Sequence, residues 1–320
     1  MAPLRSTRAA RGFAAAAIFT LLAPLAFAQS GDDALATCLA QPATAAEAES
    51  HAQACSAFLA RSGEAPDKRA AALTARGFIA LGRNDNAPAL ADFNAALGID
   101  AKLELPLYGR AVAYLNSGQA EKAIPDYDRL IAAHPDNPKL LVGRGDAHNN
   151  LKQYGDGVAD FEHALRLDPR DDEAMNDRAW ALARMGHYDE AITGYDEALQ
   201  VATSGRTLVL ANRCEAKAMA GRIDAALADC EAALKLAPGS ADLWSARGFA
   251  YLRGGRLAPA MADFDAALGI KPDDAYSLYG RGIARLRSGA KTEGEADIAA
   301  AQKRDPKIGD TLREIGVAPP

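Results

Sequence analysis

Four cysteines carry the most reactive side chains of this sequence, and their spacing limits the chemistry they can perform. They are Cys38, Cys55, Cys214 and Cys230, so the closer pairs are 17 and 16 residues apart. A catalytic dithiol usually has two intervening residues, and no such spacing occurs here. An even number of cysteines in an oxidising compartment favours disulfides. Of the three possible arrangements, the spacing favours pairing in order along the chain.

The histidines and the other polar residues form no recognisable catalytic or metal-binding motif. No histidine lies at zinc-site or catalytic spacing from a cysteine or carboxylate, and the aspartates do not match a calcium loop. No glycine-rich phosphate loop follows a strand. The sequence therefore predicts a protein that is not an enzyme, with no metal and no cofactor. The histidines, which we expect at the surface, are His51, His134, His148, His163 and His187.

An arginine followed by a small residue recurs along most of the chain. Its period is 34 residues, with one interval of 35. Seven occurrences at one period are typical of a repeat array, in which each repeat is one supersecondary unit. The repeated arginines are Arg76, Arg110, Arg144, Arg178, Arg213, Arg247 and Arg281.

An aspartate follows each arginine by 16 residues in all repeats but one, where Gly194 replaces it. In a helical hairpin that turns near its fourteenth residue these two positions lie at similar height, which predicts a structural ion pair within each repeat. The alternative is an arginine ladder that binds a ligand. Arg178 is the arginine most available for another role, unless Asp196 or Asp160 replaces its missing partner. The predicted pairs are Arg76–Asp92, Arg110–Asp126, Arg144–Asp160, Arg213–Asp229, Arg247–Asp263 and Arg281–Asp297.

Small and bulky residues form further columns at the same period. A small residue follows each arginine, and a bulky residue lies sixteen positions beyond it in six repeats, at Phe93, Tyr127, Phe161, Tyr195, Phe264 and Ile298. Small residues let two helices approach while a large neighbour fills the gap beside them. Cys214 and Cys230 replace the small and the bulky residue of one repeat, so a disulfide explains both; two separate buried thiols are the alternative. Cys38 and Cys55 are expected to join two helices of an N-terminal cap.

These columns resemble the tetratricopeptide repeat family. The best match is at Trp244, Gly248, Tyr251, Ala260, Phe264, Ala267 and Pro272, and the resemblance covers residues 70 to about 306. The sequence departs from the family in having arginine where leucine usually precedes the glycine. The resemblance implies an all-α fold, a right-handed superhelical solenoid of about seven helix-turn-helix repeats that bury their apolar faces by stacking.

The resemblance also implies a concave groove lined by the first helix of each repeat. The residues it places there as a partner groove are Tyr108, Asp146, Asn149, Asn176, Trp180, Glu215, Phe249, Tyr276 and Tyr279, together with Phe78 and Val112. Aromatic rings with amides and acids between them suit an extended peptide. The alternative is that Phe78, Val112 and Phe249 only pack between repeats. The lysine and asparagine clamp of the chaperone-tail receptors in this family is not matched, so we expect a neutral or basic segment.

The first 28 residues have the pattern of a cleaved export signal. Arg5, Arg8 and Arg11 precede an apolar stretch that ends at Ala26-Phe27-Ala28, which is shorter than the ~20 apolar residues of a membrane-spanning helix. Without these three arginines, 33 basic residues remain against 42 acidic ones, a net charge of −9. Such a charge repels nucleic acid. The sequence therefore predicts an exported protein with no membrane span after cleavage, in the periplasm or in the medium.

The predicted organisation is a signal peptide at 1–28, a helical cap at 29–69, seven repeats at 70–306, and a capping helix with a tail at 307–320. The leading hypothesis for function is an exported scaffold that binds a protein or extended peptide in the groove. The alternative is a self-associating component of an envelope assembly, which would make the protein a homo-oligomer. A more remote alternative is an enzyme with an unrecognised site.

Overall fold

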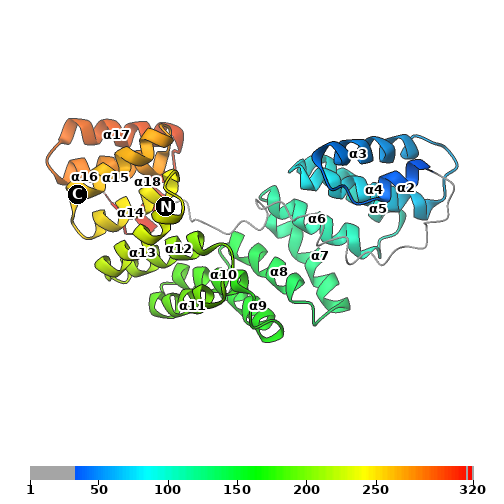
Figure 1. The fold of residues 1–320 in the computed structure, drawn as a ribbon, viewed down its shortest axis with the longest axis horizontal. Coiled ribbons are helices and arrows are strands. Elements are labelled where there is room, and N and C mark those ends of the chain that lie inside the picture. Colours follow the sequence, from blue (N-terminus) through cyan, green and yellow to red (C-terminus); the bar gives the residue numbers. More distant parts are fainter. Residues whose placement is uncertain (1–32, 315, 319–320) are drawn as a thin grey trace. The chain divides into compact units, whose positions relative to one another are not determined.

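The computed structural model describes residues 33–314 and 316–318, and all the secondary-structure elements in this part of the chain are helices (Figure 1). The predicted signal peptide at 1–28 and the last two residues of the predicted tail lie outside the described residues. The helices are α2 (Asp33–Leu39), α3 (Ala45–Leu59), α4 (Pro66–Gly82), α5 (Asn86–Ile99), α6 (Glu104–Asn116), α7 (Ala120–Ala133), α8 (Pro138–Asn150), α9 (Tyr154–Leu167), α10 (Asp172–Arg184), α11 (Tyr188–Val201), α12 (Arg206–Met219), α13 (Ile223–Leu236), α14 (Ala241–Arg253), α15 (Leu257–Ile270), α16 (Ala275–Arg287), α17 (Lys291–Arg304) and α18 (Ile308–Glu314).

The helices from α4 to α17 form seven consecutive pairs, one for each predicted repeat. The two helices of each pair pack against one another, and the second helix of most pairs packs against the first helix of the next pair. This confirms the predicted all-α solenoid of stacked helical hairpins. The described chain falls into two compact units, which we call the N-terminal unit, up to Asp168, and the C-terminal unit, from Pro169 onward.

The repeated columns of small and bulky residues explain how neighbouring helices approach each other. The ring of Phe264, on α15, is fully buried between Gly248 on α14 and Gly280 on α16. A Cβ atom at Gly248 would lie 2.8 Å from this ring, and one at Gly280 would lie 2.5 Å from it. One bulky residue thus joins its own repeat to the next repeat through two glycines.

The first helices of several neighbouring repeats also pack directly against each other, as α12 does with α14 and α14 with α16. The second helices of neighbouring repeats, among those described, do not pack against each other to this extent. The first helices therefore form the inner side of the stack. We call the side formed by α10, α12, α14 and α16 the first-helix face of the C-terminal unit.

Helices outside the seven repeats cover both ends of the stack. At one end α2 and α3 pack on each other and on α4, and at the other end α18 packs on α16 and α17. Ile308 and Leu312 of α18 are fully buried, in agreement with the expectation that the apolar side of this helix covers the last repeat. Among the described helices, none combines the length and the apolar character needed to cross a membrane.

Candidate functional site

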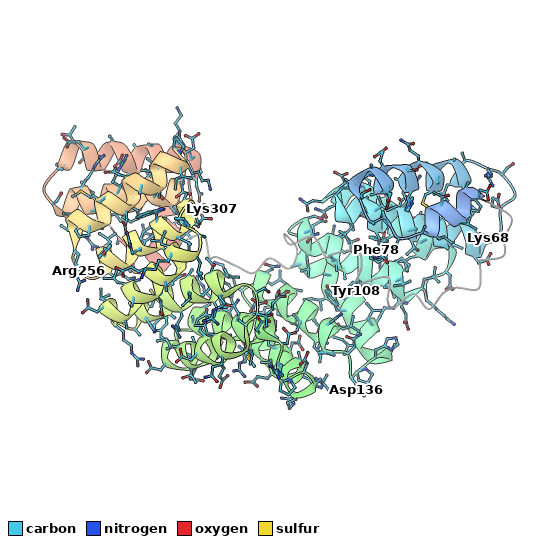
Figure 2. The ribbon with its side chains drawn as sticks, viewed as in Figure 1. Lys68, Phe78, Tyr108, Asp136, Arg256 and Lys307 are labelled. Atoms are coloured by element: carbon cyan, nitrogen blue, oxygen red, sulfur yellow. A yellow bond between two sulfur atoms is a disulfide. The ribbon has the colours of Figure 1, made fainter. Side chains whose placement is uncertain are left out.

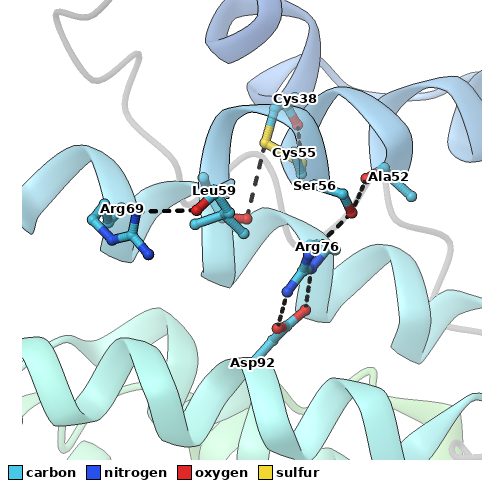
Figure 3. A network of polar contacts seen from close by, with 9 residues as sticks. Cys38, Ala52, Cys55, Ser56, Leu59, Arg69, Arg76 and Asp92 are labelled. Carbon is cyan, nitrogen blue, oxygen red and sulfur yellow. Dashed lines mark hydrogen bonds and ion pairs between the residues drawn. A yellow bond between two sulfur atoms is a disulfide. The ribbon is translucent and has the colours of Figure 1, made fainter. Parts of the chain in front are cut away.

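The repeated arginines form ion pairs with the predicted aspartates. Arg76 donates from Nε and Nη2 to the two carboxylate oxygens of Asp92 at 2.8 and 2.7 Å (Figure 3). The other five predicted pairs have the same two-bond geometry, with distances from 2.6 to 2.9 Å. The planar guanidinium matches a carboxylate in this way, which fixes the two helices of a repeat against each other.

Several of these arginines also reach the preceding repeat. Nη1 of Arg144 donates to Asp128 at 2.7 Å, and Nη1 of Arg281 donates to Asp265 at 2.6 Å. Hydrogen bonds to Asp160 and Asp128 raise the pKa of the Arg144 guanidinium further above its usual value, against the opposing effect of burial. Because their donors are already occupied by carboxylates, these arginines join repeats together rather than present a ladder to a ligand.

Arg178, which we expected to be the repeated arginine most available for another role, also has an acidic partner. Its Nη2 forms an ion pair with Glu197 at 3.0 Å, on the second helix of the same repeat. Glu197 lies one residue beyond the expected substitute Asp196, which instead pairs with Arg213 of the next repeat. The longer glutamate side chain thus replaces the aspartate that Gly194 lacks.

Both cysteine pairs lie in disulfides, and both are buried. Cys38 and Cys55 join the two cap helices α2 and α3, with their Cα atoms 4.6 Å apart (Figure 3). Cys214 and Cys230 join the two helices of one repeat, with their Cα atoms 5.5 Å apart. These distances lie within the range of disulfides.

Most aromatic residues predicted for the partner groove have buried side chains. Trp180, Phe249 and Tyr279 are 6, 3 and 2% exposed. Phe249 packs edge-to-face on Phe264 with ring centroids 5.0 Å apart, and Phe78 packs in the same way on Phe93. Phe78 and Phe249 therefore contribute to packing, which was the alternative interpretation of these two residues, and Val112 is also buried. Figure 2 labels Phe78 and Tyr108 among the side chains of the N-terminal unit.

The remaining predicted groove residues fall on both units. Tyr108 and Asp146 are half-buried and Asn149 is buried in the N-terminal unit, whereas the others belong to the C-terminal unit. Among these, Tyr276 and Glu215 are half-buried. Asn176 and Glu215, which were predicted for the groove, belong to a group of polar side chains on α10 and α12.

This group, which we call the polar cluster, consists of Asn176, Asp177, Asn212 and Glu215 on α10 and α12. Nδ2 of Asn212 donates to Oδ1 of Asn176 at 3.0 Å, and Nδ2 of Asn176 donates to Asp177 at 3.0 Å. Burial raises the pKa of the neighbouring Tyr195 hydroxyl well above its usual value, and the charges of Glu215 and Asp177 add to the effect. Asp177 and Glu215 thus both act electrostatically on the Tyr195 hydroxyl.

Several side-chain atoms on α12, α14 and α16 have no hydrogen-bond partner among the described residues. Two of them are Oδ1 of Asn212 and Oγ of Ser245, whose side chains are 3 and 5% exposed. Ser245 occupies on α14 the register position that Asn176 occupies on α10. Unpaired buried groups of this kind cost stability, so each one requires an explanation. Sequence patterns did not indicate these two residues, because an isolated Asn or Ser on a helix is not a motif.

Two further arginines, Arg253 and Arg287, were also missed from the sequence. They are the last residues of α14 and α16, and we call them the arginine pair. Among the described arginines with a displaced pKa, only that of Arg253 is lowered: burial lowers it, and repulsion by Arg287 adds to this, while Glu215 and Tyr188 oppose the change. Arg253 forms no ion pair with the described residues, and its Nη2 makes no hydrogen bond.

The described residues contain no group of histidines, cysteines and carboxylates that could hold a metal ion. Four histidines have contacts within the chain instead. One example is His134, whose Nε2 lies 2.8 Å from Glu104 at an exposed position. By contrast, the unpaired Oδ1 of Asn212 and Oγ of Ser245 on the first-helix face are suited to hydrogen bonding with another molecule.

Comparison with protein families identifies tetratricopeptide repeats in three parts of the chain. One family model described as a tetratricopeptide repeat matches residues 161–193, and a second matches residues 108–156 and 216–275. A search of curated protein sequences found no match.

Comparison with solved structures finds proteins of the same architecture. A tetratricopeptide repeat protein from Parabacteroides merdae has a TM-score of 0.65 at 19% identity, over 77% of this chain and 98% of the other. PilW, described as a type IV pilus biogenesis factor, has a TM-score of 0.58 at 18% identity, over 66% of this chain and 99% of the other. The APC/C hetero-tetramer Cut9-Hcn1 has a TM-score of 0.56 at 17% identity, over 94% of this chain and 60% of the other. At these identities the similarity shows the fold.

Proposed function

Because this chain belongs to the tetratricopeptide repeat family, we propose that it is an exported scaffold that binds a protein or an extended peptide and catalyses no reaction. We place the binding surface on the first-helix face of the C-terminal unit. The observation that carries this proposal is the polar cluster, which contains a buried acceptor, Oδ1 of Asn212, without a hydrogen-bond partner among the described residues.

The register position of Asn212 supports a role beyond packing. Five other repeats have a glycine or an alanine there, at Ala75, Gly109, Gly143, Ala246 and Gly280, and the repeat of α10 has Asp177. A small residue thus meets the packing requirement, whereas an unpaired buried amide oxygen costs about 1 to 3 kcal/mol. A main-chain N–H of a bound segment would supply the missing donor and remove this cost.

The chemistry of the cluster favours a partner that donates hydrogen bonds. Asp177 and Glu215 supply carboxylate oxygens, and Asn212 supplies an amide oxygen. Main-chain amides and basic side chains are the complementary groups. This agrees with the expectation from the sequence that the bound segment is neutral or basic at this end of the face.

Export is supported by the N-terminal sequence pattern and by the two disulfides. Disulfides persist in oxidising compartments and are rare in the reducing cytosol. We place the mature protein in the bacterial periplasm, where the partner would be another exported protein.

Affinity capture from an envelope extract tests this function. The mature protein should capture a partner, and an Asn212→Ala, Glu215→Gln variant should lose at least about 90% of the captured amount. A Glu231→Gln, Lys235→Ala variant is the matched control, because both residues are exposed on the second helix of the same repeat. Equal capture by all three proteins, after folding is verified by circular dichroism, would show that this face does not bind the partner.

A further inference from the structure

Residues 316–318 lie against the first-helix face at the arginine pair. Nη2 of Arg287 donates to the main-chain oxygen of Ala318 at 3.2 Å. Gly316 lies beside Arg253, since a Cβ atom built on this glycine would be 3.3 Å from Nη2 of Arg253. A segment from the end of α18 therefore covers positions on both α14 and α16.

A helix-ending motif directs the segment to this place. Gly316 has a φ of 70°, which glycine adopts without strain. Its N–H donates to the oxygen of Arg313, and the N–H of Val317 donates to the oxygen of Leu312, both at 2.9 Å. This is the Schellman arrangement, in which the apolar residue after the glycine packs back on the helix. Val317 is 2% exposed and belongs to the same buried cluster as Leu312 and Ile283.

Residues 316–318 provide acceptors for only some of the N–H donors of the arginine pair. Each guanidinium has five N–H donors. The segment supplies one carbonyl to Arg287, and Arg253 has no acceptor among the described residues. The two cations are close enough for repulsion to lower the pKa of Arg253, and Glu215 is the nearby acid that opposes the effect. Two neighbouring guanidiniums with unused donors match a carboxylate better than a neutral carbonyl.

We propose that the arginine pair binds an extended segment of a partner through a carboxylate, and that residues 316–318 occupy this site as an internal competitor in the free protein. The proposal rests on the proposed function, and it means that the two ends of the binding face have opposite hydrogen-bonding character. The polar cluster accepts hydrogen bonds from one end of the bound segment, and Arg253 and Arg287 donate to the other end. The sequence alone predicts a neutral or basic segment because Glu215 is taken into account but Arg253 and Arg287 are not. That prediction then applies only to the end of the segment that lies at the polar cluster.

The test uses a synthetic peptide with the sequence of residues 314–320 in which aspartate replaces Ala318. Its binding is measured by NMR titration of the arginine Nε–H signals of the full chain and of a Val317→Lys variant. Lysine is too polar for the buried position and is repelled by the arginine pair, so it displaces the internal segment. Because an attached segment competes at an effective concentration in the millimolar range, the peptide should bind the variant at least about tenfold more tightly than the native chain.

Matched substitutions in the Val317→Lys chain test the arginine pair itself. Arg253→Gln and Arg287→Gln should each weaken binding about tenfold, whereas Arg256→Gln should leave it unchanged. Arg256, labelled in Figure 2, lies in the same repeat as Arg253 but pairs with the exposed Asp224. Equal binding to the native chain and to Val317→Lys would overturn the internal competitor. Binding that does not depend on Arg253 and Arg287 would overturn the site.

A second measurement covers the case in which Val317→Lys does not fold. In the native chain, a saturating amount of the peptide should increase hydrogen exchange at the amide of Val317 at least about tenfold, because release of the segment breaks its hydrogen bond to Leu312. Unchanged exchange would contradict the proposal. If a partner is captured through Asn212 and Glu215 while these tests fail, the proposed function stands and this inference alone is wrong.

Discussion

The repeated arginine is the residue that most clearly separates structure from binding in this protein. One guanidinium pairs with the aspartate of its own repeat and, in several repeats, with an acid of the preceding one. Arg253 and Arg287 have the same chemistry but no carboxylate partner among the described residues. The same side chain therefore stabilises the fold at one register position and is available to a ligand at another.

Loss of one repeated arginine should destabilise the protein because it leaves a buried acid. Arg110→Met would leave Asp126, which is 3% exposed, without its ion pair. We expect a loss of about 2 to 3 kcal/mol in urea unfolding, less than for a fully buried pair because Arg110 is partly exposed. Adding Asp126→Leu should recover part of the loss. Arg222→Met, which breaks an exposed pair with Asp189, should cost less than about 1 kcal/mol.

The buried Tyr195 hydroxyl should make stability depend on alkaline pH. Its pKa is raised in the folded protein above the usual 10.0, so only the unfolded chain loses this proton just above that pH. The stabilisation is present below pH 10 and decreases as the pH rises beyond it, at up to 1.4 kcal/mol per pH unit. Tyr195→Phe should decrease the slope between pH 10 and 11 in urea unfolding. An unchanged slope would contradict this account.

At the scale of helical elements, close approach depends on a glycine facing a ring. In the repeat of α14 and α15 the pair is Gly248 and Phe264, and in the repeat of α12 and α13 a disulfide replaces it. Both solutions hold the two helices of a repeat together. They do so by different means, since the first relies on packing and the second on a covalent bond.

Gly248→Ala should destabilise the protein by about 1 to 3 kcal/mol, because its Cβ atom would lie 2.8 Å from the ring of Phe264. Gly269→Ala is the control within α15, since no atom lies within 4 Å of its added Cβ. Alanine has the higher helix propensity, so this control should stabilise the protein by about 0.5 to 1 kcal/mol. Thermal unfolding of both variants measures the difference. A loss of equal size at both glycines would exclude steric overlap as the cause.

Removal of the Cys214–Cys230 disulfide should destabilise its repeat. Cys214→Ala with Cys230→Ala should cost about 3 kcal/mol in urea unfolding without reductant. Cys214→Gly with Cys230→Phe should recover part of this loss, because it restores the glycine and the ring of the other repeats. If both double variants lose the same stability, packing cannot replace the disulfide.

At the scale of the whole molecule, the division into two units depends on how the repeats stack, and no sequence feature marks it. The boundary lies between Asp168 and Pro169. Pro135 and Pro238 occupy the same register position as Pro169 without such a boundary. The one longer interval, between Arg178 and Arg213, also lies elsewhere, where Gly205 adopts a φ of 71° before α12.

The number of reactive thiols in the purified protein tests whether the protein is exported. Protein purified from the envelope without reductant should have no reactive thiols when denatured, since all four cysteines form the two disulfides. After reduction, four thiols should react. Four reactive thiols before reduction would contradict the pairing and weaken the case for an oxidising compartment.

The sequence by itself determined the helical hairpins, their register and the pairing of arginine with aspartate. These features repeat every 34 residues, and one period specifies which residues of a hairpin lie side by side. The small and bulky columns follow from the same repetition, because every repeat must meet its neighbour in the same way.

Only the tertiary structure decided which polar residues of different repeats meet. The contact of Asn176 with Asn212, the Arg178–Glu197 pair and the position of residues 316–318 beside Arg253 depend on side-chain directions and on stacking. None of these features repeats along the chain, so no column reveals them. The burial of Trp180 and Tyr279 was likewise not predictable, because a register position indicates the face of a helix but not how closely other atoms cover it.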